Sequence, residues 1–322
     1  MWDTHEDAYR YNQEKEKILM KKQVMLVAGV LLVSMLVGCA NVKVQNTSEA
    51  KEPAAVEQTK GEVDRVEMNF KQLENVFGFA DEAGEKLITI STENGSKLIN
   101  PEEFNIALGN NGEMIRIKFV KQQEANDMDV LRQTMYNFNN MAGYIYEAID
   151  GKFIQNKTYL LSKDTIVNRN ALVDLESKKD MQSKIIKYQE VDIETIKQIE
   201  VIKGRKIIKS SLISESSDHE KICLFVFERK ADDMLASIAY TKEEKVVFKD
   251  YPAKYNETST WRVDGGDDPG LFEVLFLANS DEGLLLGLTW AAPEGENVYI
   301  LKEVNGIFEE TALNAYRYSS PN

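Results

Sequence analysis

The chain has 322 residues, 43% hydrophobic and 29% charged, a globular composition that excludes a fully disordered chain or a polytopic membrane protein. Its 39 Lys and Arg against 53 Asp and Glu give a formal net charge of -14, which disfavours a nucleic-acid binder because phosphate neutralisation needs a basic face. Two His and two Cys are too few for most His-rich metal sites, a four-Cys zinc ribbon or a disulfide-stapled fold.

The first apolar segment is the run 24–37, VMLVAGVLLVSMLV, which follows Lys21 and Lys22. A membrane-spanning helix needs about 20 apolar residues, so this run is short for a span. A basic start, an apolar middle and small residues at the end are the parts of an export signal. We therefore predict a signal peptide over residues 20–38.

The signal ends in a more specific motif, Leu36-Val37-Gly38-Cys39. This motif resembles the lipobox of bacterial prolipoproteins, and the resemblance covers about residues 20–40. It implies cleavage before Cys39 and attachment of diacylglycerol to the Cys39 thiol, which would anchor the protein at the extracytoplasmic face of the cell membrane. Two acyl chains suffice for stable anchoring where one does not. The alternative is an uncleaved signal anchor with an unmodified Cys39.

Residues 1–19 fit neither an export signal nor an anchor, because they are polar and carry five acidic residues against three basic ones. We expect translation to start at Met20 and residues 1–19 to be an upstream extension. Peptides from this segment in cells would contradict that expectation.

Residues 39–65 carry the lipidated cysteine and then a stretch rich in Ala, Glu, Lys, Gln and Thr without an aromatic residue. Such a composition cannot bury enough apolar surface to offset its conformational entropy. We predict a flexible spacer that lifts the folded part off the membrane.

Residues 66–204 mix strand and helix signals. Alternation predicts strands at 86–91 and 114–120, and Asp150-Gly151 predicts a hairpin between strands at 144–149 and 152–161.

Two helical segments are also expected in residues 66–204. Asn100 followed by Pro101 and two acids is typical of a helix start, and the apolar spacing over 172–198 favours two helices.

The sequence of residues 205–322 predicts consecutive strands separated by turns, which is the pattern of an antiparallel β-rich unit. The predicted strands lie at 206–214, 222–228, 234–240, 245–249, 259–263, 271–277, 284–290 and 298–302. The fold class that follows is α+β: a mixed N-terminal part and an antiparallel β-rich C-terminal part, arranged as a sandwich or an open barrel.

The sequence of the β-rich part resembles itself when it is shifted by 50 residues. LFVF at 224–227 falls on VLFL at 274–277, and Ile238-Ala239-Tyr240 falls on Leu288-Thr289-Trp290. A duplicated four-strand meander explains the match, and so does the general likeness of β-meanders. A weaker third copy at 145–153 resembles 300–308.

His219 and Cys223 are the obvious candidates for nucleophilic chemistry, and neither is convincing. His219 lies in the polar run SSDHE between two strands, which is typical of a solvated turn. Cys223 lies within a strand, on the side opposite Ile222 and Leu224, where a free cysteine acts as a small buried hydrophobe. We assign no catalytic residue.

The segment 264–270, DGGDDPG, is the one candidate metal site. Ca²⁺ prefers six to eight oxygen ligands, and Asp264, Asp267 and Asp268 on a glycine-rich loop could supply some of them. The EF-hand order is not met, and Asp, Gly and Pro also form plain turns. A calcium-dependent β module is therefore one hypothesis and a plain turn is the other, and no other cofactor is expected.

Aromatic residues gather in the C-terminal half at Tyr240, Tyr251, Tyr255, Trp261, Trp290 and Tyr299. They could form a sugar- or peptide-binding platform, but core packing explains their positions at strand ends better.

The sequence favours a non-catalytic binding or adaptor module of the cell envelope, with an envelope protein or a wall component as partner. The motivation is the anchor and spacer, combined with the lack of a glycine-rich phosphate loop or any other assembled catalytic motif. The rival hypothesis is an extracytoplasmic hydrolase that uses a carboxylate pair.

Replacing Cys39 with alanine tests the anchor. The Cys39→Ala chain should leave the membrane fraction, because the acidic body is repelled by anionic lipid and only the tether holds it there. Membrane fractionation followed by immunoblotting measures this. A variant that stays with the membrane would favour the uncleaved signal anchor.

Overall fold

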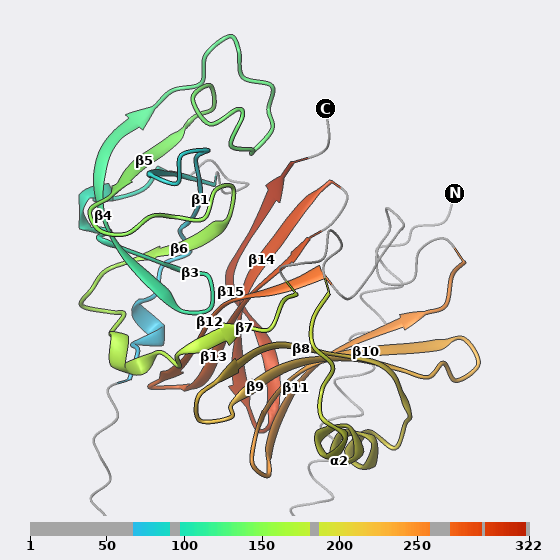
Figure 1. Cartoon of the computed structure of the whole chain (residues 1–322). Helices are drawn as coiled ribbons and strands as arrows, with labels where there is room; N and C mark the ends of the chain where they lie inside the picture. The colour runs from blue at the N-terminus through green and yellow to red at the C-terminus, as the bar shows by residue number, and fades with distance from the viewer. Residues whose placement is uncertain (1–66, 91–96, 181–186, 258–270, 292–293, 320–322) are drawn as a thin grey trace, which may run out of the picture. The chain divides into compact units, whose positions relative to one another are not determined.

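The structure, a computed structural model, describes residues 67–90, 97–180, 187–257, 271–291 and 294–319. These residues are mainly β structure, in a closed barrel and one larger, nearly closed sheet (Figure 1). The β-rich C-terminal prediction is confirmed. The α+β label is supported only loosely, because the residues described contain a single α-helix, α2 (Ile193–Lys203), beside short 3-10 turns.

The barrel is formed by six short strands in the order β1-β2-β5-β4-β3-β6. Pairing of β1 with β6, with Phe77 opposite Leu160, closes it. Its strands are β1 (Phe77–Ala80), β2 (Lys86–Thr89), β3 (Ile106–Gly109), β4 (Glu113–Gln123), β5 (Gly143–Ala148) and β6 (Thr158–Ser162).

The larger sheet has nine strands in the order β12-β13-β14-β15-β11-β10-β9-β8-β7. Two antiparallel meanders meet in a parallel contact between β11 and β15, at Phe248 and Ile307. One nearly closed sheet therefore replaces the expected choice between a sandwich and an open barrel. Its strands are β7 (Leu175–Ser177), β8 (Ile207–Ser216), β9 (Lys221–Phe227), β10 (Asp233–Lys242), β11 (Lys245–Lys254), β12 (Phe272–Ser280), β13 (Gly283–Ala291), β14 (Gly295–Val304) and β15 (Ile307–Tyr318).

The offset of 50 residues reappears in the strand registers. Ile238 pairs with Leu224, and fifty residues later Leu288 pairs with Val274. The next strand pair also repeats, Ala236 with Tyr251 and Leu286 with Leu301. The equivalent sets are the three-strand meanders β9-β10-β11 and β12-β13-β14. The strand predicted at 259–263, which would correspond to β8 at this offset, lies outside the described residues.

The hairpin predicted at Asp150-Gly151 does not form. β5 pairs with β2 and β4, whereas β6 pairs with β1 and β3. The Asp150 carboxylate instead accepts hydrogen bonds from the backbone and the side chain of Arg116 on β4. The proposed third copy fails with it, since Asn305-Gly306 makes a tight hairpin between β14 and β15 and Asp150-Gly151 does not.

Of the three helices predicted, one at Asn100 and two within 172–198, the structure confirms one. α2 begins at Asp192, whose side chain accepts from the Thr195 N–H, and ends at Gly204 in the left-handed region. The helix start at Asn100 yields only the 3-10 turn η2 (Pro101–Glu103), because Phe104 is buried and β3 begins two residues later. Residues 172–180 contain the short strand β7 rather than a helix, and residues 181–186 of the same prediction lie outside the described residues.

The remaining 3-10 turns are η1 (Phe70–Gln72) and η3 (Arg169–Ala171). In the part of the chain that the structure describes, no helix is long and apolar enough to cross a membrane.

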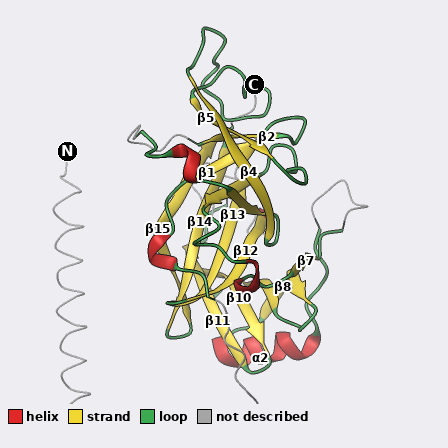
Figure 2. Cartoon of the chain, turned by 90° about the vertical axis from the view of Figure 1, so that its left-hand side faces the viewer, coloured by secondary structure: helices red, strands yellow, loops and turns green. Residues whose placement is uncertain are grey.

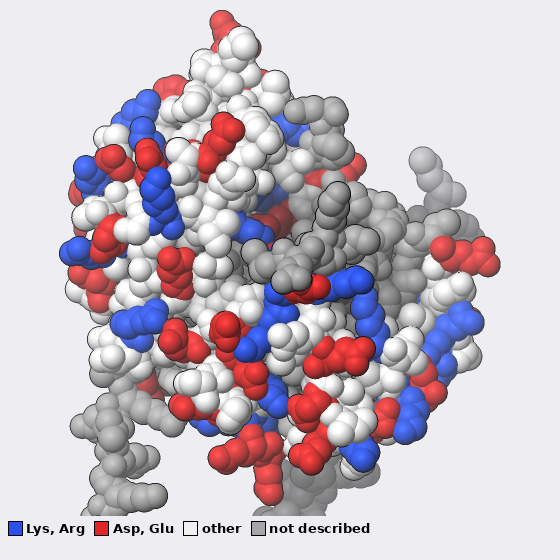
Figure 3. All heavy atoms as spheres, viewed as in Figure 1, with Lys and Arg blue, Asp and Glu red and all other residues white. Residues whose placement is uncertain are grey.

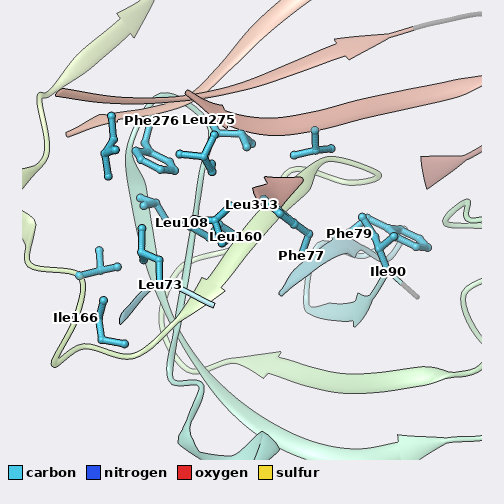
Figure 4. Packing of buried hydrophobic residues seen from close by; sticks show 14 of the residues in the cluster. Leu73, Phe77, Phe79, Ile90, Leu108, Leu160, Ile166, Leu275, Phe276 and Leu313 are labelled. Carbon is cyan, nitrogen blue, oxygen red and sulfur yellow. The ribbon is translucent and has the colours of Figure 1, made fainter. Parts of the chain in front are cut away.

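The barrel and the sheet share one hydrophobic core. Leu275 and Phe276 of β12 point toward Leu108 and Leu160 of the barrel, and Leu313 of β15 joins the same cluster (Figure 4). Because every one of these side chains is buried, the barrel and the sheet are packed as one folded body.

The β3–β4 turn, Asn110-Asn111-Gly112, connects the two sheets (Figure 2 shows the strands around it). The backbone N–H of Asn111 donates to the Val274 carbonyl at 3.0 Å, and that of Gly112 donates to the Leu275 carbonyl at 2.7 Å. The Asn111 side chain accepts from the Ser214 hydroxyl on β8 at 2.5 Å. The turn therefore bridges β12, at one end of the sheet order, and β8, next to the other end.

Gly112 has a φ of +97°, and a Cβ there would lie 3.3 Å from the Val173 carbonyl oxygen. Gly112→Ala should therefore lower the free energy of unfolding of the full chain in urea, by about 1–2 kcal/mol for the left-handed backbone alone. Gly306→Ala is the matched control, since Gly306 has a φ of +80° in a turn with open space around it. We expect Gly112→Ala to cost about 1 kcal/mol more than Gly306→Ala, because it also disturbs the bonds to β12; equal losses would show that the turn does not hold the two sheets together.

Candidate functional site

A groove of about 340 Å³ lies between the barrel and the larger sheet. The barrel side contributes the Asn110-Asn111 turn and the segment around Lys157 and Thr158, and the sheet side contributes β7, β8, β12, β13 and β14. This volume is at the lower end of the range for small-molecule sites.

Glu273 on β12 is the central charge of the groove. Its carboxylate forms ion pairs with Lys157 from the barrel side and with Lys179 just after β7, the latter at 3.1 Å. The side chains of Glu273 and Lys179 are each 27% exposed. Burial raises the pKa of Glu273, but the two ammonium groups outweigh burial and hold the pKa below its ordinary value.

A second carboxylate, Glu296 on β14, lines the same groove. It accepts a hydrogen bond from the Thr158 hydroxyl at 2.6 Å, and that hydroxyl accepts from Arg317 at 3.3 Å. Arg317 is buried, and burial lowers the pKa of its guanidinium. The Arg317 guanidinium also donates to the carbonyls of Gln133 and Asn156, at 2.7 and 2.6 Å, so one β15 side chain fixes two other segments, at Gln133 and at 156–158.

Neutral hydrogen-bonding groups complete the lining. Ser214, Thr289 and Tyr188 border the groove beside apolar patches at Ile213 and Val274. The Tyr188 hydroxyl donates to the Phe272 carbonyl at 2.9 Å, and burial raises the pKa of Tyr188, so this phenol stays protonated. The groove thus offers hydroxyl and amide groups, an ion-paired carboxylate and some apolar surface, a combination suited to polar ligands.

His219 lies in a solvent-exposed turn and Cys223 in a buried strand, as the sequence predicts. His219 has a φ of +61° in the β8–β9 turn, and its exposed ring approaches Glu215 at 3.5 Å. Cys223 is fully buried among Phe225, Phe227 and Ala239, on the opposite face from Ile222 and Leu224. Burial raises the pKa of the Cys223 thiol, which makes a nucleophilic thiolate unfavourable.

The aromatic residues of the C-terminal half mostly pack in the core. Trp290 stacks on Phe272 with ring centroids 4.7 Å apart and meets Tyr251 edge-on. The hydroxyls of Tyr251 and Tyr299 lie 2.6 Å apart. Tyr240 is buried, and Tyr255 is partly exposed beneath Arg229. Trp261 lies outside the described residues.

The candidate calcium ligands Asp264, Asp267 and Asp268 and the lipidation site Cys39 also lie outside the described residues, so both hypotheses stay predictions. Within the described ranges, no three His, Cys, Asp or Glu side chains come together as a metal site.

Sequence reasoning did not identify Glu273, Lys157, Lys179 or Glu296 as residues of a site. These residues are far apart in the chain, and each is an ordinary charged residue in a sequence rich in them. On the face drawn in Figure 3, basic and acidic side chains are interspersed, so charge alone does not mark the groove. Only the tertiary placement of β12 between the two lysines identifies it.

Comparison with protein families, curated proteins and solved structures gives no match for this chain.

Glu273→Gln should destabilise the full chain at pH 7 by about 1–3 kcal/mol, because the two lysines lose their shared counter-charge. Since the folded-state pKa of Glu273 is lowered, its contribution is present above the ordinary value of 4.5 and is lost as the pH falls below it. The difference in unfolding free energy between the parent chain and the variant should therefore shrink in acid.

Urea unfolding at several pH values measures this difference. The matched control is Glu147→Gln, which breaks the more exposed pair with Lys118 and should change stability little. Equal effects of the two substitutions would contradict a special role for Glu273.

Proposed function

We propose that the chain is a lipid-anchored extracytoplasmic protein that acts as a non-catalytic binding module, holding a polar component of the cell wall in the groove between its two sheets. The observation that carries the proposal is the ion-paired Glu273 in a groove lined with hydroxyl and amide groups. The lipobox at Leu36–Cys39 and the spacer that follows support the placement outside the membrane.

The charge state of Glu273 favours binding over catalysis. A carboxyl that acts as a general acid near neutral pH needs a raised pKa, and that of Glu273 is lowered by Lys157 and Lys179. A fixed ion pair with some exposure instead offers a ligand both a donor and an acceptor. A wall fragment carries hydroxyl and amide groups that match this lining.

The binding test uses soluble peptidoglycan fragments from a muramidase digest as the probe, titrated calorimetrically into the full chain. Ile154 lines the groove and is 41% exposed, so Ile154→Trp should obstruct the groove without opening a cavity in the core. We expect binding to weaken roughly tenfold or more, which corresponds to about 1.4 kcal/mol.

Ile149→Trp is the matched control, since Ile149 is an exposed isoleucine of the same β5–β6 connection that does not line the groove. It should bind like the parent chain. Equal affinity for all three chains, or no heat of binding with any of them, would contradict the proposal.

A hydrolase that uses the carboxylate pair Glu273 and Glu296 is the second candidate, because both line one groove. In that mechanism Glu296 would have to be the proton donor, since the lowered pKa of Glu273 suits a nucleophile or base. Mass spectrometry of the fragments after incubation separates the two functions: unchanged masses support a binding module, and cleavage that Glu296→Gln abolishes would support the hydrolase.

A further inference from the structure

The β4–β5 connection, residues 124–142, exposes a group of large apolar side chains. Met128, Leu131 and Tyr136 are each more than 70% exposed, and Val130 is 55% exposed. These four residues together with the exposed acid Asp127 are called the loop tip below. Long loops that present apolar side chains are commonly interaction sites.

The loop is held firmly in place. The buried side chain of Asn137 donates to the Asp129 carboxylate at 2.7 Å and to the Arg132 carbonyl at 2.8 Å. Phe138 and Met141 anchor the loop in the barrel core.

The C-terminal strand also fixes the loop. The N–H of Gln133 donates to the Tyr318 carbonyl at 2.7 Å, and Arg317 donates to the Gln133 carbonyl. A surface fixed in this way loses little conformational entropy when it binds.

Local hydrogen bonds hold Leu131 in an unfavourable backbone conformation in which its side chain is exposed. Its φ is +59°, a left-handed conformation that is unfavourable for a leucine, and its N–H donates to the Asp129 carboxylate at 2.8 Å. Local hydrogen bonds therefore stabilise a strained conformation in which the leucine is 76% exposed.

Among the described residues, a second exposed apolar surface lies on α2. Ile193, Lys197 and Val201 follow one another at spacings of four residues on one helix face, and Ile193 and Val201 are 61% and 82% exposed. Beside them is a hollow of about 470 Å³, lined by Lys197, Val201, Arg205 and Lys206 among others. This surface is called the helix patch below.

The two surfaces are complementary in charge as well as in apolar character. Asp127 is exposed at the loop tip, and Glu124 and Asp129 lie in the same loop. In the helix patch, Glu200 is engaged by Lys206 at 2.7 Å, whereas Arg205 donates to the backbone carbonyls of Glu228 and Asp233. The charged residues that line the hollow are Lys197, Arg205 and Lys206 against Glu200 and Glu228, so the lining keeps one positive charge in excess beside its apolar residues.

Figures 1 and 2 place the loop and α2 at opposite ends of the described body, so the two surfaces cannot meet within one molecule. We propose that the occupant of the helix patch is the loop tip of a second copy of this chain. Because different surfaces meet in such a contact, it is head-to-tail, and it builds a ring or an open row of molecules rather than a two-fold dimer. This assembly goes beyond ligand binding in the groove and does not depend on it.

The loop tip is poorly suited to a lipid surface or to a loop tip on another copy. Anionic lipid repels Asp127 and Glu124, and two loop tips in contact would bring like charges together. A patch that carries Lys197 and Arg205 removes both conflicts.

Oxidative cross-linking of the full chain in cells tests the contact. A chain with both Leu131→Cys and Val201→Cys should give a ladder of dimers and larger species on a non-reducing gel, whereas each single variant should stay monomeric. Co-expression of the two single variants should give dimers only. Cys223 is fully buried and present throughout, and the parent chain controls for Cys39.

A chain with Ile149→Cys and Val201→Cys is the matched control and should give no ladder, since Ile149 is exposed but lies outside the loop tip. Charge reversal adds a second readout. Asp127→Lys and Lys197→Asp should each lower the cross-linked yield roughly fivefold, and the two together should restore it.

Four outcomes would overturn the proposal. The first is a double cysteine variant that stays monomeric. The second is the formation of dimers by the Leu131→Cys chain alone, which would show that two loops pair with each other. The third is the formation of adducts between that chain and another protein, which would show a different partner. The fourth concerns labelling of the Leu131→Cys thiol with a membrane-impermeant maleimide. Labelling that occurs only when Cys39→Ala has also released the chain from the membrane would show that lipid covers the loop tip.

Discussion

The hydrogen-bonding edge of β12 is the constraint on which the rest of the structure depends. β12 is an end strand of the larger sheet, and an end strand presents backbone groups that must be covered or solvated. Segments that precede it by a hundred residues or more cover this edge: the Asn111 and Gly112 N–H groups bond to Val274 and Leu275, the Val173 N–H bonds to Leu277, and the Met68 N–H bonds to Asn279. The β3–β4 turn of the barrel and the segments that precede and follow the barrel thus cover the edge of the second sheet, which is why the barrel and the sheet share a core.

The groove follows from the same arrangement. Glu273 precedes the two β12 carbonyls that the β3–β4 turn contacts, so the docking that closes the edge also brings this carboxylate between the two sheets. One of its lysines comes from the barrel side and the other follows β7. An uncompensated carboxylate at this depth would be costly, and Lys157 reduces that cost only when the barrel is docked on the larger sheet. The electrostatics of the groove therefore depend on the assembly of the whole body.

Local sequence signals were sufficient where the structure is locally determined. The apolar spacing at the end of 172–198 and the alternation within 114–120 are each set by neighbours within a few residues, and the structure contains α2 and β4 at these places. The Asp150-Gly151 turn failed because strand pairing in the barrel is decided by closure and not by the residues at the turn. β15 was missed since its inward positions over 311–317 alternate in burial but carry Thr311, Leu313, Ala315 and Arg317, so the sequence shows no apolar alternation there. The groove could not be predicted, because its charged residues become neighbours only after β12 docks.

Arg317 is a residue whose role the sequence did not predict, and it connects the loop tip with the groove. Its guanidinium is buried above the ring of Phe79, and it donates to Gln133 at the base of the exposed loop and to Thr158 at the wall of the groove. Thr158 in turn donates to Glu296, so the buried positive charge lies one hydroxyl away from a groove carboxylate. A buried guanidinium is stable only where its donors are matched by acceptors, which ties the positions of the loop base, β6 and β14 to one another. The loop tip and the groove are therefore presented by one hydrogen-bonded unit, and a rigid loop and a preformed groove are two consequences of the same buried charge.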